Sequence, residues 1–140
     1  MEDSPMPRLY REAPVNAIWE GSGNIQCLDV LRVMQKSPEV LTTYFDEVDL
    51  ARGRSSILDT YIATLKTDLS DATEIEYRAR DLVDRVALGL QAALLLRHAP
   101  DFVAHAFCRS RLASSGHHQY GTLPRGVAVQ EIIARAMPHI

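Results

Sequence analysis

With 140 residues, of which 46% are hydrophobic, the chain is long enough for one compact core and too short for two ordinary domains. Its charged residues (24%) and ordinary Gly and Pro content exclude a wholly disordered chain, and the net charge of −3 argues against strong non-specific nucleic-acid binding. The longest apolar stretch, 86–96, is far shorter than the roughly 20 residues that cross a bilayer, and no export signal is visible, so we expect a cytoplasmic protein without a membrane segment.

The chain opens with a proline-rich stretch followed by a helix. Residues 1–17 hold three prolines and no helical periodicity, which predicts an extended lead-in. A first helix is predicted to follow residues 22–24 and to stop near Lys36. Ser22, Gly23 and Asn24 supply N-cap chemistry, and apolar residues follow at helical spacing.

Two further helices are predicted in the acidic part of the chain. Ser37 is suited to cap a helix that begins at Pro38 and runs toward Gly53. Ser55 or Ser56 opens the next helix, whose apolar residues up to position 69 recur at i, i+4 spacing.

The longest predicted helix lies in the middle of the chain. Asp71 and Glu74 stand three residues apart before a periodic apolar run, as in a capping box, and the run extends to about His98. Its second half, 87–96, is apolar on nearly all sides, which is typical of a helix buried between several neighbours. We therefore expect this helix to form the core.

The C-terminal part completes an all-helical pattern. Asp101 is predicted to cap a fifth helix that reaches Leu112, a loop follows over 114–126, and a last helix is predicted over 127–137. No strand pattern competes anywhere in the sequence. The predicted fold class is all-α, an antiparallel helical bundle of about five to six helices preceded by an extended N-terminal segment.

Cysteine and histidine spacing gives no sign of a metal site. Cys27 and Cys108 lie far apart and are interpreted as reduced, structural thiols. His117 and His118 lie in the predicted loop with no carboxylate or Cys beside them, which favours a mobile loop over a metal site.

The most informative stretch is Trp-Glu-Gly-Ser-Gly-Asn at positions 19–24. Small residues let a backbone approach a ligand closely, and free amides at the start of a helix suit an anion. One interpretation is therefore an anion site with Glu20 at its mouth. The other is a turn and N-cap, with Glu20 as an ordinary surface carboxylate.

The sequence over 4–32, SPMPRLYREAPVNAIWEGSGNIQCLDVLR, resembles the C-terminal signature of acyl-CoA dehydrogenases, and more narrowly that of their AidB-like branch. In that signature an aromatic-Glu-Gly-Ser or -Thr segment precedes the final long helix. The resemblance implies that Glu20 is the base that removes the α-proton of an acyl-CoA thioester while the flavin takes a hydride. It also implies a set of residues that line FAD: Ile18, Trp19, Gly21, Ser22, Gly23, Asn24 and Leu28.

The same resemblance divides the chain into two parts. Residues 1–36 correspond to the end of the dehydrogenase C-terminal domain, and residues 37–140 more loosely to the extra helical domain of the AidB-like branch, which contributes to DNA binding there. The arginines available for phosphate contacts are Arg78, Arg80, Arg85, Arg109, Arg111 and Arg125. The alternative, solvated arginines paired with nearby Asp and Glu, stays open.

Members of the family are several hundred residues long and have flavin and substrate domains with no counterpart here. We therefore expect the C-terminal fragment of an acyl-CoA dehydrogenase-like flavoprotein, inactive by itself and binding no FAD alone, although the family as a whole binds FAD and acyl-CoA. A stand-alone helical module that binds DNA or protein is the alternative. Uncovered apolar side chains such as Leu9, Ile18 and Trp19 predict a homo-oligomer.

Overall fold

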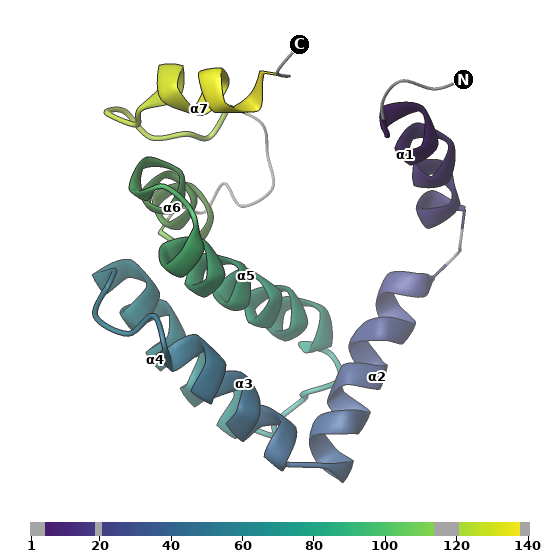
Figure 1. The fold of residues 1–140 in the computed structure, drawn as a ribbon. Coiled ribbons are helices and arrows are strands. Elements are labelled where there is room, and N and C mark those ends of the chain that lie inside the picture. Colours follow the sequence, from purple (N-terminus) through teal and green to yellow (C-terminus); the bar gives the residue numbers. More distant parts are fainter. Residues whose placement is uncertain (1–4, 19–20, 114–120, 138–140) are drawn as a thin grey trace.

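A computed structural model describes residues 5–18, 21–113 and 121–137, and every regular element in these ranges is helical (Figure 1). This confirms the all-α class. In chain order the elements are α1 (Met6–Glu12), the 3-10 turn η1 (Ala13–Ala17), α2 (Ser22–Lys36), α3 (Glu39–Asp49), α4 (Ser56–Ser70), α5 (Ala79–His98), α6 (Asp101–Phe107), the π turn η2 (Cys108–Leu112) and α7 (Val129–Ala136).

Helix α5 lies at the centre of the packing. It contacts α2, α3, α4, α6 and η2, and Figure 1 shows α2 beside its N-terminal end and α6 beyond its C-terminal end. The most deeply buried large side chains come from α3, α4 and α5, among them Val48, Leu58, Leu65 and Leu82. The predicted long helix is thus the core of the bundle, because its neighbours cover it on several sides.

The proline-rich lead-in is helical from residue 6 to residue 17, so the prediction of an extended segment is wrong there. Pro7 occupies the first turn of α1, and Pro14 the first turn of η1. Proline is tolerated there, because the amide it lacks would have no acceptor within the helix. Helix α1 contacts only η1 among the described elements, and none of its residues is buried.

The helix starts differ from the predicted caps. Gly21, Pro38 and Pro100 are the N-cap residues of α2, α3 and α6, and none of the described helices has a side-chain hydrogen bond at its N-cap. Ser55 does occupy the N-cap of α4, but its side chain is buried and hydrogen-bonds the Cys108 thiol instead. The Ser55 side chain therefore takes part in tertiary packing instead of capping α4.

The predicted capping box at Asp71 and Glu74 is also wrong, since α5 begins only at Ala79. The Asp71 carboxylate instead accepts a hydrogen bond from the amide of Thr73 at 2.9 Å, and Glu74 adopts a left-handed backbone with φ of 49°. Local bonds of this kind compete with helix formation. The result is a turn over residues 71–78 rather than a longer helix.

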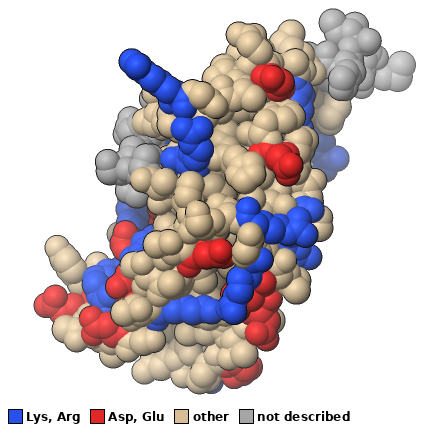
Figure 2. All heavy atoms as spheres, turned by 90° about the vertical axis from the view of Figure 1, so that its left-hand side faces the viewer, with Lys and Arg blue, Asp and Glu red and all other residues tan. Residues whose placement is uncertain are grey.

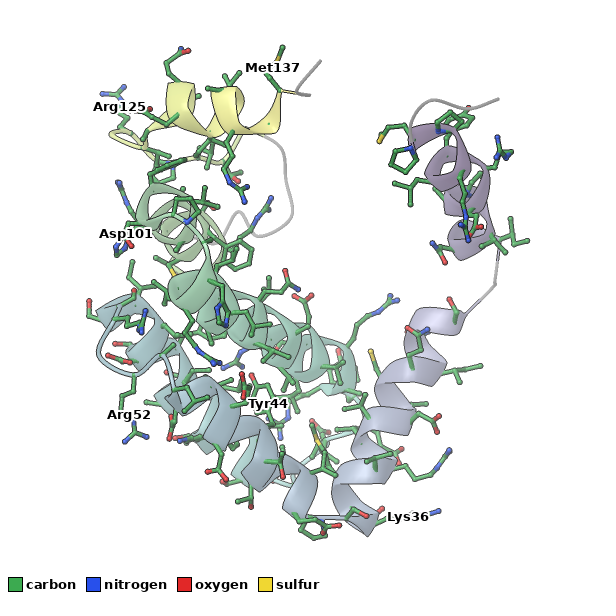
Figure 3. The ribbon with its side chains drawn as sticks, viewed as in Figure 1. Lys36, Tyr44, Arg52, Asp101, Arg125 and Met137 are labelled. Carbon is green, nitrogen blue, oxygen red and sulfur yellow. The ribbon has the colours of Figure 1, made fainter. Side chains whose placement is uncertain are left out.

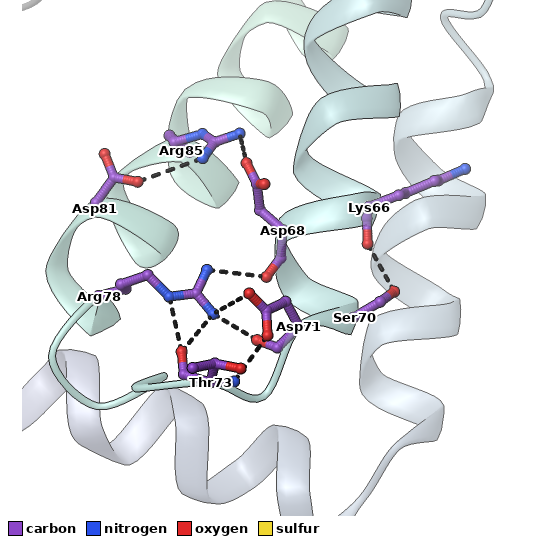
Figure 4. A network of polar contacts seen from close by, with 8 residues as sticks. All are labelled: Lys66, Asp68, Ser70, Asp71, Thr73, Arg78, Asp81 and Arg85. Carbon is purple, nitrogen blue, oxygen red and sulfur yellow. Dashed lines mark hydrogen bonds and ion pairs between the residues drawn. The ribbon is translucent and has the colours of Figure 1, made fainter.

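Arg78 holds this turn against the end of α4 (Figure 4). Its guanidinium donates to the backbone carbonyls of Asp68 at 3.3 Å, of Thr73 at 2.9 Å and of Asp71. A helix end leaves carbonyls without partners, and a planar guanidinium with five donors can bind several at once. The amide and hydroxyl of Thr73, together with the Arg78 charge, hold the pKa of Asp71 below its usual value.

The C-terminal elements follow the prediction only in part. The predicted fifth helix is divided into α6 and the π turn η2, and the last helix is shorter than expected. The predicted loop over 114–126 lies partly outside the described residues, and His117 and His118 lie wholly outside them. Within the described ranges, no helix combines the length and apolar character needed to span a membrane.

Candidate functional site

The segment that the sequence singles out is described from Gly21 onward. Gly21 has a left-handed backbone with φ of 67°, and its carbonyl accepts the amides of Asn24 at 3.0 Å and Ile25 at 3.2 Å. By position, the amides of Ser22 and Gly23 have no acceptor inside their own helix. The start of α2 therefore offers the local chemistry that the sequence indicates.

The predicted base and its aromatic neighbour, Glu20 and Trp19, lie outside the described residues. Of their neighbours, Ile18 is 70% exposed, and Asn24 is also exposed. Ile18 and Asn24 therefore lie on the surface of the described chain.

The residues predicted to line a cofactor lie in two separate hollows. Ser22 lines a hollow of about 240 Å³ with Val15, Asn16 and Gln26. Leu28, two turns further along α2, faces a different groove. Ligand pockets usually have volumes of about 300–1,000 Å³ and enclose most of the ligand. Ser22 and Leu28 therefore line different hollows in the part of the chain that the structure describes.

The second groove is larger and mainly apolar, although Arg32, Gln35 and Glu76 also line it. It has a volume of about 490 Å³ and lies between α2, α3 and the α4–α5 turn. Its apolar walls are Leu28, Leu31, Met34, Leu41, Leu69 and Ile75. Sequence reasoning missed this groove, because its walls come from helices whose mutual packing no local pattern encodes.

Gly23 joins the candidate segment to the core helix. The Arg80 side chain of α5 lies directly against Gly23, so a β-carbon at this position would collide with the guanidinium. A side chain at position 23 would therefore require the exposed Arg80 side chain to move, which a flexible arginine can do. The proximity of residues 23 and 80 was not foreseen from the sequence.

Two of the six arginines proposed for phosphate contacts are held in ion pairs. Arg78 pairs with Asp71 at 3.7 Å, in addition to its carbonyl contacts. Arg85 pairs with Asp68 at 2.7 Å and with Asp81 at 3.4 Å. Burial lowers the pKa of Arg85, but the hydrogen bonds and charges of the two carboxylates outweigh this effect and raise it. The positive charges of Arg78 and Arg85 are therefore largely compensated by these carboxylates.

The other four arginines differ in their surroundings. Arg109 donates to the backbone carbonyl of Arg125 at 2.8 Å, and Arg111 also takes part in a polar interaction. Arg80 and Arg125 are exposed. Figure 2 shows Lys and Arg interspersed with Asp and Glu on one face of the molecule. On that face, the charges do not form the continuous positive surface that tracks a phosphate backbone.

The cysteines differ in burial, and neither forms a disulfide. Cys108 is fully buried, whereas Cys27 on α2 is half-buried. Burial raises the pKa of the Cys108 thiol, although its hydrogen bond with Ser55 acts in the opposite direction. In the part of the chain that the structure describes, no group of three His, Cys, Asp or Glu could hold a metal ion.

Comparison with curated proteins identifies the family. The chain is 30% identical over 120 residues to acyl-CoA dehydrogenase family member 11 of Caenorhabditis elegans, a match that covers 72% of the chain and 19% of that protein. No family model matches the chain. This helical chain with its loop-to-helix segment is homologous to a segment of acyl-CoA dehydrogenase family proteins.

The similarity extends to AidB of Escherichia coli (strain K12), which is assigned by name to the acyl-CoA dehydrogenases. The identity is 37% over 115 residues, which cover 82% of this chain and 21% of AidB. The chain therefore spans about a fifth of the length of the curated relatives that it matches. The resemblance inferred from residues 4–32 is confirmed.

Proposed function

We propose that this chain supplies one edge of the flavin site and the terminal helical domain of an acyl-CoA dehydrogenase-like flavoprotein. The observation that carries the proposal is 37% identity to AidB across 82% of the chain. In this proposal residues 1–36 complete the dehydrogenase C-terminal domain, and residues 37–140 form the added helical domain.

The proposed catalytic residue is Glu20, acting as the base that takes the α-proton of an acyl-CoA thioester. A bound FAD would accept the hydride, which is the chemistry that a flavin supplies. Around it, the small residues Gly21 and Ser22 would let the backbone approach the flavin closely. Ile18 and Asn24 would face the cofactor, and their exposure supports this placement, because it leaves them free for another part of the protein to cover.

The added domain would position the flavin-facing segment through its contacts with α2. Gly23 on α2 lies against Arg80 on α5, so the orientation of the first turn of α2 depends on the packing of the bundle. A shift of about 1 Å in a catalytic group can cost about a hundredfold in rate. The bundle would thus act on the chemistry through the position of α2.

The test is a chimera in which this chain replaces the aligned segment of E. coli AidB. The chimera should retain flavin, seen as its visible absorbance at one per chain, and anaerobic addition of acyl-CoA should bleach that absorbance. The Glu20→Gln variant should keep its flavin and lose the bleaching, because an amide cannot accept the α-proton.

Glu12→Gln is the matched control, since Glu12 is an exposed carboxylate on α1 whose only described ion pair is with Arg8. It should leave both readouts unchanged. A chimera that folds but holds no flavin would contradict the placement of the segment. A Glu20→Gln chimera that is bleached at the rate of the unmodified chimera would contradict the role of Glu20.

A further inference from the structure

Arg78 joins the end of α4 to the start of α5 across the turn over residues 71–78 (Figure 4). It directly precedes α5, and its guanidinium donates to the backbone carbonyls of Asp68 at 3.3 Å and of Thr73 at 2.9 Å, as well as to that of Asp71. Only 27% of its side chain is exposed, and the Asp71 carboxylate lies 3.7 Å away. These contacts fix where α5 begins relative to α4, because the donors of a guanidinium form a rigid planar fork.

The first residues of α5 also lie next to α2. Ala79, which follows Arg78, is only 4% exposed, and the Arg80 side chain lies against Gly23 in the first turn of α2. The two helices contact each other, and Figure 1 shows the start of α5 beside α2. A displacement of the start of α5 would therefore displace α2 as well.

The turn provides a second connection to α2 through the groove of about 490 Å³. Ala72 and Ile75 of the turn line this groove together with Leu28 and Leu31 of α2. Ile75 also packs against the hydrophobic core, which anchors this wall of the groove. Leu28 is one of the residues predicted to line the flavin. The groove that Leu28 lines is thus formed in part by the segment that Arg78 holds.

We propose that Arg78 is a positioning residue of the flavin site: through the start of α5 and the wall of the groove, it sets where the first two turns of α2 lie. This inference rests on the proposed function, because it takes residues 18–28 to face the flavin. Arg78 contacts neither cofactor nor substrate in this placement. It acts by geometry and not by charge, since lysine would keep the charge but could not bind three carbonyls at once.

Hydrogen exchange of the 140-residue chain tests whether Arg78 positions α2, without any flavin. Arg78→Lys should speed the exchange of the amides of residues 24–28 at least fivefold relative to those of α6, which lies beyond the other end of α5. Arg52→Lys is the matched control and should change this ratio less than twofold. Figure 3 shows the Arg52 side chain pointing outward, away from Lys36 and α2. Equal acceleration at α2 and α6 would overturn the proposal, because it would show only a general loss of stability.

The chimera with E. coli AidB tests the effect on the chemistry. With Arg78→Lys, the chimera should keep one flavin per chain, and saturating acyl-CoA should bleach it at least tenfold more slowly. The half-saturating concentration of acyl-CoA should change less than threefold. A merely structural role would lower the yield of flavin-loaded protein and leave the rate per bound flavin unchanged. Arg52→Lys should leave both the rate and the half-saturating concentration unchanged.

Ile75→Val is a second, milder variant. It keeps Arg78 and removes one carbon from the wall of the groove, and it should slow the bleaching at least twofold. Bleaching at the parental rate in the Arg78→Lys chimera would overturn the proposal, as would a parental rate in Ile75→Val if the Arg78→Lys chimera holds no flavin. An unmodified chimera without flavin would contradict the proposed function instead, and the exchange ratio would then decide whether Arg78 positions α2.

Discussion

The hydroxyl oxygen of Tyr44 lies over Gly89, so that a β-carbon on residue 89 would be only 2.8 Å from it. The same β-carbon would be 2.9 Å from Cδ1 of Ile62. This proximity lets Tyr44 donate a hydrogen bond of 2.8 Å to the carbonyl of Val86, one turn earlier on α5. Side chains of α3 and α4 therefore both lie directly against α5 at Gly89.

Gly89→Ala is expected to lower the free energy of unfolding by about 1 kcal/mol. Overpacking costs about 1–3 kcal/mol, whereas alanine gains about 1 kcal/mol over glycine in helix propensity. Urea denaturation followed by circular dichroism measures the difference. In the Tyr44→Phe background, the same substitution should cost less, because the oxygen that crowds the new methyl group is gone. A Gly89→Ala protein more stable than the parent would show that the contact is loose.

Arg78→Lys is expected to destabilise the chain by about 2 kcal/mol, although it preserves the charge. A hydrogen bond made by a charged group contributes about 1.5–3 kcal/mol, and lysine cannot span the carbonyls of Asp68, Asp71 and Thr73 together. Arg52→Lys is the control, since the Arg52 side chain is 66% exposed and pairs only with Asp49 among the described residues. Exposed pairs contribute about 0–1 kcal/mol. Equal losses for the two variants, in thermal or urea unfolding, would contradict the assigned role of Arg78.

Stability should fall at high pH through Tyr61. Burial, the largest cause, raises the pKa of Tyr61 to about 12 from its ordinary value of 10.0, with Arg85 acting in the opposite direction. Because the folded pKa lies above the unfolded pKa, this contribution is complete below pH 10 and is lost as the pH rises toward 12. Unfolding free energies measured across this range should fall more steeply for the parent chain than for Tyr61→Phe. Parallel curves would contradict the raised pKa.

The two thiols should react with a disulfide reagent at very different rates. The half-buried Cys27 should react in the folded chain, whereas the fully buried Cys108, with its raised pKa, should react only on unfolding. Absorbance of the released thiolate counts the reacted groups against time. Cys27→Ser should remove the fast phase and leave the slow one. A fast phase that persists in this variant would show that the site around Cys108 opens readily.

The helices could be predicted from sequence wherever one apolar face repeats. The pattern after Ser22 predicts α2 to its last residue, and the clean i, i+4 repeat after Ser56 predicts α4 within a residue of its end. The start of α5 could not be found in this way. Asp71 and Glu74 have the spacing of a capping box, but the Asp71 carboxylate accepts the amide of Thr73 instead. Arg78 binds the carbonyls of Asp68 and Asp71, so the chain turns before α5 begins.

The candidate site, too, was predictable from sequence only in part. Residues 18–28 were recognisable because they form one contiguous motif, and similarity to curated acyl-CoA dehydrogenase family proteins confirmed the resemblance. The proximity of Gly23 to Arg80 was not recognisable, since 57 residues separate the two in sequence.

The sequence by itself determined an all-helical chain and its family, because helical periodicity and a contiguous motif are local properties. Only the tertiary structure decided where α5 begins, which arginines are bound in ion pairs, and which helices form the groove beside α2. These depend on contacts between residues distant in the chain, whose energies exceed the small local preferences that a sequence pattern records.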